Sequence, residues 1–152
     1  MEFKSLQVKN FRSFEDISID LSNKNVFFGL NDVGKTNLLT ALRFVFDRDI
    51  RRNDFMDSDY FEKKTEIPIE ILVTVDISDN NEDSSKLRAR LRGAILSGQD
   101  LIYIRLISKY DNSEMVGVAE LFWGGDKENL QEIKPRAVSY THLRAHETCA
   151  DL

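Results

Sequence analysis

Apolar and polar residues alternate in several parts of the chain, and this alternation predicts strands. Two are expected near the start, at residues 3–10 and 17–21, joined by the short connection FRSFED. A short apolar run at 26–28 is consistent with a buried strand. Two further strands are expected at 101–109 and 115–123.

The clearest alternation lies in residues 67–75. The apolar face of this predicted strand consists of Ile67, Ile69, Ile71, Val73 and Val75. The opposite face carries Glu70, Thr74 and Asp76. One dry and one wet face favour an antiparallel strand, and Pro68 near its start suggests a position at the edge of a sheet.

Helical spacing predicts two helices. The first runs from Lys35 to about Asp47, and the second begins at Ser84 or Ser85 and continues to about Ser97. The first helix has an apolar face made of Leu38, Leu42 and Val45, widened by Leu39 and Phe46. Residues 48–66 are charged, contain aromatics and have no period, so they are interpreted as a surface connection.

Composition and charge narrow the class of protein. Charged residues make up 31% of the 152 residues and hydrophobic residues 41%, which is typical of a globular domain. No apolar run approaches the ~18 residues that span a bilayer, and the N-terminus lacks a signal-peptide core, so we expect a cytoplasmic protein without membrane contact. The net charge of −5 excludes a strongly basic nucleic-acid-coating protein.

The last sixteen residues, 137–152, are interpreted as foreign to the gene. The stretch VSYTHLRAHET matches, residue by residue, the translation of a DNA string that resembles a transposon-end adapter used to prepare sequencing libraries. Both histidines and the single cysteine fall in this segment. His142 and His146 have the spacing of a helical zinc pair, but in a foreign segment this spacing is not interpreted as a metal site. We therefore expect residues 1–136 to be the incomplete N-terminal part of a domain, and exclude 137–152 from fold reasoning.

One motif carries chemistry. Residues 29–36, GLNDVGKT, fit the P-loop pattern G-x-x-x-x-G-K-[ST], between a predicted strand and a predicted helix. Gly29 and Gly34 allow a tight turn whose N–H groups face a phosphate, and the helix N-terminus favours an anion. Lys35 is expected to reach the β- and γ-phosphates of ATP, and the Thr36 hydroxyl to hold Mg²⁺.

The sequence around the P-loop resembles a particular group of ATPases. The stretch VKNFRSF at 8–14, followed by GLNDVGKTNLL at 29–39, is similar to the N-terminal ATPase lobe of the RecF, SMC and OLD group. Downstream, the general character of the sequence from Asp47 to Tyr60 looks most like that of OLD-family ATP-dependent endonucleases. The resemblance implies an α/β fold: a P-loop NTPase, here a truncated ABC-type lobe with an antiparallel β portion.

The resemblance also implies a nucleotide site beyond the P-loop glycines. In the group, the arginine matched by Arg12 lies beside the bound nucleotide, and the asparagine matched by Asn31 lies within the loop. Asp32 and Val33 stand where the group usually has Gly or Ser, and Asp32 either weakens nucleotide binding or points outward. The full expected set is Arg12, Ser13, Gly29, Asn31, Asp32, Val33, Gly34, Lys35, Thr36 and Asn37.

For the full-length protein, the resemblance implies an OLD-type ATP-dependent endonuclease whose nuclease domain is absent from residues 1–136. It also implies ATP and Mg²⁺ as cofactors, DNA as a partner and a homodimer. The alternative is a RecF-like or SMC-like DNA-binding ATPase without nuclease activity, and a plain GTPase or small-molecule kinase is disfavoured by the two strands before the loop. No Walker B strand, signature helix or catalytic acid is identifiable by residue 136, so no catalytic residue is assigned and residues 1–136 alone are expected to be inactive.

One acidic cluster invites a metal interpretation. Asp54, Asp57 and Asp59 lie close together, but they lack the spacing and the glycine of an EF-hand. A solvated loop is the favoured interpretation.

Overall fold

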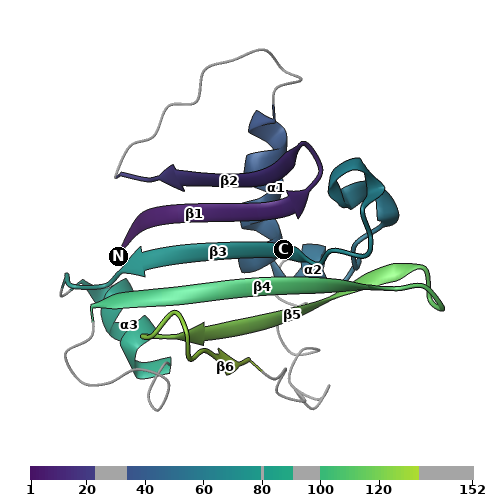
Figure 1. The fold of residues 1–152 in the computed structure, drawn as a ribbon. Coiled ribbons are helices and arrows are strands. Elements are labelled where there is room, and N and C mark those ends of the chain that lie inside the picture. Colours follow the sequence, from purple (N-terminus) through teal and green to yellow (C-terminus); the bar gives the residue numbers. More distant parts are fainter. Residues whose placement is uncertain (23–33, 80, 91–99, 134–152) are drawn as a thin grey trace, which may run out of the picture.

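The computed structural model describes residues 1–22, 34–79, 81–90 and 100–133. A six-stranded sheet dominates these residues, in the order β2-β1-β3-β4-β5-β6, and every neighbouring pair is antiparallel. Helix α1 crosses one face behind β1, β2 and β3 (Figure 1). The strands are β1 (Glu2–Phe11), β2 (Phe14–Asp20), β3 (Ile69–Asp76), β4 (Leu101–Asp111), β5 (Val116–Gly124) and β6 (Gln131–Glu132). The helices are α1 (Lys35–Phe46), α2 (Arg48–Arg51) and α3 (Glu82–Arg90), with single turns of 3₁₀ helix at Asp57–Asp59 and Phe61–Lys63.

The predicted strands at 3–10, 17–21, 101–109 and 115–123 are confirmed, with ends displaced by a few residues. β1 and β2 form a hairpin in which Leu6 lies opposite Ile19, and Val8 opposite Ile17. Leu6 and Val8 are fully buried, as their shared face predicts. The strand expected at 26–28 lies outside the described residues.

β3 confirms the predicted antiparallel strand but corrects its start and its position. Ile69, Ile71, Val73 and Val75 are buried, whereas Ile67 is 48% exposed and precedes the first paired residue. β3 pairs with β1 on one side and β4 on the other, so it is a central strand and the edge prediction was wrong. Pro68 lies just before the ladder begins, where no backbone N–H is needed.

Helix α1 supplies the helical side of the core. Its buried residues are Leu38, Ala41, Phe44 and Val45. Leu42 is half-buried, while Leu39 and Phe46 are 57% and 48% exposed. The prediction that Leu39 and Phe46 widen the buried face was therefore wrong: the stripe widens toward Ala41 and Phe44 instead. The Phe46 ring meets Phe3 edge-on, with centroids 5.5 Å apart.

Residues 48–66 are not a simple surface connection. Short helical turns fold this segment back so that Phe55 and Tyr60 enter the core, at 0% and 1% exposure. The Phe55 ring stacks on Phe44 of α1, with centroids 4.1 Å apart. Isolated β-bridges join Phe11 to Tyr60 and Phe55 to Gly117. An irregular segment buries side chains one at a time, so it leaves no period for sequence analysis to detect.

Helix α3 begins earlier than predicted. The side chain of Asn81 accepts a hydrogen bond from the backbone N–H of Ser84 at 2.9 Å, which is N-cap geometry. Ser84 lies inside the helix and is fully buried, so neither Ser84 nor Ser85 is the cap. The predicted continuation to Ser97 lies largely outside the described residues.

Within the described ranges, no helix is long and apolar enough to cross a membrane.

The Tyr60 hydroxyl sits in a closed slot between β4 and β5. It lies 3.1 Å from the Ser108 hydroxyl and donates to the Ser108 carbonyl at 3.3 Å. Burial raises the pKa of Tyr60, because the phenolate would be desolvated there. Gly117 forms the floor of the slot: a Cβ there would lie 2.2 Å from Tyr60 Oη and 2.6 Å from Ser108 Oγ.

We expect Gly117→Ala to destabilise the domain by about 1–3 kcal/mol, the usual cost of overpacking a filled core. The measurement is chemical denaturation of the full-length protein. Tyr60→Phe introduced together with Gly117→Ala serves as the control, since removing the hydroxyl relieves the closest clash. The combined variant should therefore lose less stability than the sum of the two single changes. Strict additivity would show that the methyl group and the hydroxyl do not compete for this space.

Candidate nucleotide site

The structure describes two parts of the predicted nucleotide site: the turn between β1 and β2, and residues 34–37 at the start of α1. Gly29, Asn31, Asp32 and Val33 lie outside the described residues. The described parts come from sequence positions more than twenty residues apart, and the fold brings them into contact.

Gly34, the second fixed glycine of the P-loop motif, packs directly against this turn. Its φ angle of 98° lies in the left-handed region that favours glycine. A Cβ at this position would approach the Phe14 ring at 2.8 Å and the Ser13 hydroxyl at 3.1 Å. The backbone therefore comes closer to the turn than a residue with a side chain would allow.

Lys35 and Thr36 form the first turn of α1, immediately after Gly34. The Gly34 carbonyl accepts the first helical hydrogen bond, from Leu38 at 2.8 Å. No acidic residue occupies this turn, and Thr36 is exposed. A helix N-terminus whose own first turn carries no carboxylate is compatible with a phosphate.

Arg12 and Ser13 contact the same helix through Asn37. The Asn37 amide donates to Ser13 Oγ at 3.0 Å, and Arg12 Nη1 lies 3.4 Å from Asn37 Oδ1. Arg12 occupies a left-handed backbone conformation, with φ 49°, at the tip of the hairpin. The structure thus brings together Arg12, Ser13, Gly34 and Asn37 of the predicted set, with Lys35 and Thr36 on the adjoining turn.

Sequence analysis missed Asp59. The solvated-loop interpretation was wrong for this residue, which is 8% exposed and pairs with Arg12, with Nε to Oδ1 at 2.8 Å. Asp57 points elsewhere and pairs with Lys63 at 3.1 Å, and that hydrogen bond lowers the pKa of Asp57. Across the described ranges no three Asp, Glu, His or Cys side chains gather as metal ligands would. No local signal identifies Asp59, because its partner lies 47 residues earlier.

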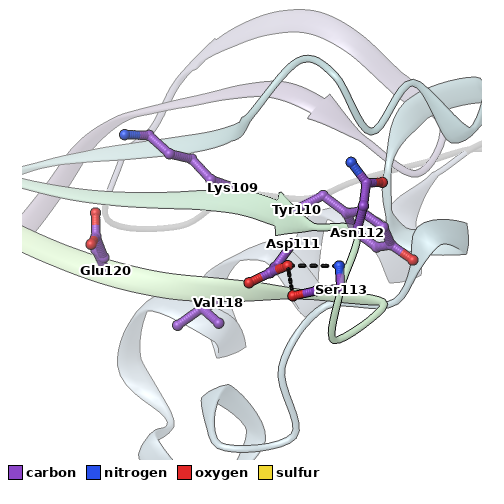
Figure 2. A pocket seen from close by; sticks show the side chains of 7 residues that line it. All are labelled: Lys109, Tyr110, Asp111, Asn112, Ser113, Val118 and Glu120. Atoms are coloured by element: carbon purple, nitrogen blue, oxygen red, sulfur yellow. Dashed lines mark hydrogen bonds between the residues drawn. The ribbon is translucent and has the colours of Figure 1, made fainter.

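A hollow among the described residues lies away from this site, at the end of the β4–β5 hairpin (Figure 2). Its volume is about 530 Å³, and it contains none of the predicted site residues. Asp111 there accepts hydrogen bonds from the Ser113 amide and hydroxyl, at 2.8 and 2.5 Å. These bonds close a polar turn, and the hollow is an open groove beside it. It is lined by Lys109, Tyr110, Asp111, Asn112, Ser113, Val118 and Glu120.

Comparison with known proteins defines the class. A model of the AAA ATPase domain matches residues 1–143, and the chain belongs to this family. It is therefore a P-loop ATPase domain, of a family whose members bind nucleotide.

Among individual proteins, the chain is 47% identical to Endonuclease GajA of Bacillus cereus (strain VD045) over 139 residues. That match covers 90% of this chain and 24% of GajA. DNA replication and repair protein RecF is also similar. The Lactococcus lactis subsp. cremoris (strain MG1363) protein is 46% identical over 46 residues, which is 30% of this chain and 13% of that protein. The Streptococcus gordonii protein is 36% identical over 88 residues, 49% of this chain and 24% of that protein. The chain thus spans about a quarter of GajA.

Proposed function

We propose that residues 1–136 form the N-terminal part of an ABC-type ATPase lobe that binds Mg²⁺–ATP at the P-loop. The observation that carries this proposal is the contact between two distant motifs. The N-F-R-S-F turn and the GKTN turn resemble the same ATPase group, and they meet through Gly34, Ser13 and Asn37. Two motifs that serve one ligand need to meet in this way.

Each polar side chain has a defined task in this site. Lys35 neutralises the β- and γ-phosphates, and Arg12 offers a guanidinium, whose planar fork suits phosphate oxygens. Thr36 holds the metal ion through its hydroxyl. Mg²⁺ supplies positive charge that offsets the charge on the transferring phosphoryl group. Because Gly34 packs closely against the hairpin turn, Arg12 on that turn and Lys35 and Thr36 on α1 keep fixed positions relative to one another.

We further propose that the full-length protein is an ATP-dependent DNA endonuclease that works as a homodimer. The support is the similarity to GajA, which covers 90% of this chain, whereas the RecF of Lactococcus lactis matches 30%. A RecF-like ATPase without nuclease activity is the second candidate, favoured by the RecF matches themselves.

DNA cleavage separates the two candidates. The full-length protein is incubated with supercoiled and linear DNA in Mg²⁺, with and without ATP, and its mass in solution is measured by light scattering. The endonuclease proposal predicts cut DNA and a dimer. ATP turnover by a dimer that leaves all DNA intact, in Mg²⁺ and in Mn²⁺, would favour the RecF-like candidate instead.

We also infer that residues 137–152 are not native. The support is the residue-by-residue match of 138–148 to the translation of adapter DNA. Resequencing the gene from independently prepared DNA tests the inference. A different native sequence in place of residues 137–152 is expected, and a gene that encodes the same sixteen residues would contradict the inference.

A further inference from the structure

We propose that Asp59 is a positioning residue that orients Arg12 toward the nucleotide phosphates. This inference rests on the proposed function, and it concerns a residue that neither the P-loop nor the N-F-R-S-F motif includes. Asp59 does not touch the nucleotide in this proposal; it acts through Arg12.

Two contacts hold Asp59 against the hairpin turn, and a third ties its carboxylate to its own turn. Its Oδ1 accepts from Arg12 Nε at 2.8 Å, and its backbone carbonyl accepts from the Arg12 amide at 2.8 Å. Its Oδ2 accepts from the Met56 amide at 3.0 Å. Asp59 therefore fixes both the backbone and the side chain of Arg12, while its second oxygen is used by its own turn.

The two oxygens of the Asp59 carboxylate have different partners, and this determines which part of Arg12 is held. Because Oδ2 serves Met56, the pair is single-pronged and engages Nε alone. Nη1 extends toward Asn37 Oδ1, at 3.4 Å, on the first turn of α1. The guanidinium is thus held at its inner end and directed toward the helix N-terminus that carries Lys35 and Thr36. A fork held in this way presents its outer edge to a phosphate.

The segment that carries Asp59 is itself anchored to β1. The Asn10 amide donates to the carbonyl of Lys64 at 2.9 Å and to that of Ile67 at 2.6 Å. Tyr60, the next residue, is locked in the core and bridges to Phe11. Arg12, meanwhile, keeps a left-handed backbone that a residue with a side chain rarely adopts. A strained residue persists where its surroundings over-determine it, and such positions cluster at functional sites.

The burial of Asp59 makes the pairing consequential. Its side chain is 11% exposed, against 33% for Arg12. A carboxylate removed from water in this way needs a charged partner and satisfied oxygens, and Arg12 together with Met56 provides both. Loss of the carboxylate would release the guanidinium to several rotamers, and the cost would appear when the nucleotide binds.

A double-mutant cycle in the full-length protein tests the proposal, with Mg²⁺–ATP affinity as the measurement. Asp59→Asn should weaken affinity about 5–10-fold, comparable to the coupling seen between contacting residues. Arg12→Ala should weaken it about 10-fold or more, as loss of a charge-assisted bond does. In the Arg12→Ala background, Asp59→Asn should change affinity by less than about twofold, since a residue that acts through Arg12 has nothing left to position.

Asp57→Asn is the matched control, because Asp57 occupies the same short turn and pairs with Lys63 rather than Arg12. It should leave affinity unchanged. Lys35→Ala, in the same titration, distinguishes failure of the positioning role from failure of the proposed nucleotide site. If Lys35→Ala abolishes binding while Asp59→Asn binds like the wild type, the positioning role fails and the nucleotide site stands. If the wild type does not bind ATP, both fail.

Additive losses in the double variant would also overturn the positioning role, since they would show that Asp59 acts independently of Arg12. Circular dichroism confirms that each variant is folded. If Asp59→Asn does not fold, the cycle is repeated with Asp59→Glu, which keeps the charge and shifts the carboxylate by one methylene. The same non-additivity is expected there, and additivity again contradicts the proposal.

Discussion

Replacing Lys35 with alanine should abolish ATP turnover by the full-length protein while leaving its fold intact. Lys35 begins the first turn of α1, beside Gly34 and the hairpin turn. In the proposed site, its ammonium group is the P-loop charge that offsets the β- and γ-phosphates during phosphoryl transfer. Removal of one such preorganised group typically lowers turnover about 100-fold or more. Lys35 is not a core residue, so the cost to stability should be small.

ATP turnover, measured by phosphate release, tests this prediction, with circular dichroism as the control for folding. Thr36→Ala should reduce turnover less, by loosening Mg²⁺ rather than removing a charge. Undiminished turnover in a folded Lys35→Ala variant would contradict the P-loop assignment. A matched surface lysine, Lys109, lies on the sheet face opposite α1, and Lys109→Ala should leave turnover unchanged.

The largest loss of stability is expected for Phe55→Ala. The Phe55 ring is fully buried, stacks on Phe44 and meets Phe11 edge-on, at centroid distances of 4.1 and 6.2 Å. Truncation would leave a cavity where the 48–66 segment, α1 and β1 converge. A cost of about 3–5 kcal/mol is typical for a phenylalanine in such a place.

Chemical denaturation measures this cost, and Phe61→Ala in the same segment provides the comparison. Phe61 is half-buried, and the Lys64 ammonium lies over its ring, 4.9 Å from the centroid. Phe61→Ala should therefore cost much less. Equal losses for the two variants would show that Phe55 is not a special anchor of this segment.

The regular strands were predictable because one face of the sheet is dry. Ile69, Ile71, Val73 and Val75 alternate with Glu70, Leu72 and Thr74, and burial follows that period except at Leu72, which is buried as well. What the period could not reveal is the neighbour of each strand. The central place of β3 results from pairing with β1, far earlier in the chain, so Pro68 misled the assignment of an edge.

The segment from 48 to 66 shows where local pattern fails. Phe55 and Tyr60 enter the core from irregular turns, and Asp59 is buried because Arg12 neutralises it. These positions depend on contacts across the fold rather than on spacing along the chain. The same holds for the exposure of Leu39 and Phe46, which depends on where α1 crosses the sheet.

The residues of the candidate site also differ in how far they could be predicted from the sequence. The P-loop motif is local, so Gly34, Lys35 and Thr36 could be found from spacing alone, and the helix that follows them is confirmed. Arg12 and Ser13 came from a resemblance, and the structure places them against Asn37. Asp59 came from neither, because its link to Arg12 spans 47 residues.

The most direct test is a calorimetric titration of the full-length protein with Mg²⁺–ATP. One saturable site per chain is expected in the wild type and in Lys109→Ala. The Lys35→Ala variant should show no detectable binding, and Arg12→Ala should show weaker binding at the same stoichiometry. Equal binding by wild type and Lys35→Ala, or no binding by either, would contradict the proposal that this P-loop and its neighbouring hairpin hold the nucleotide.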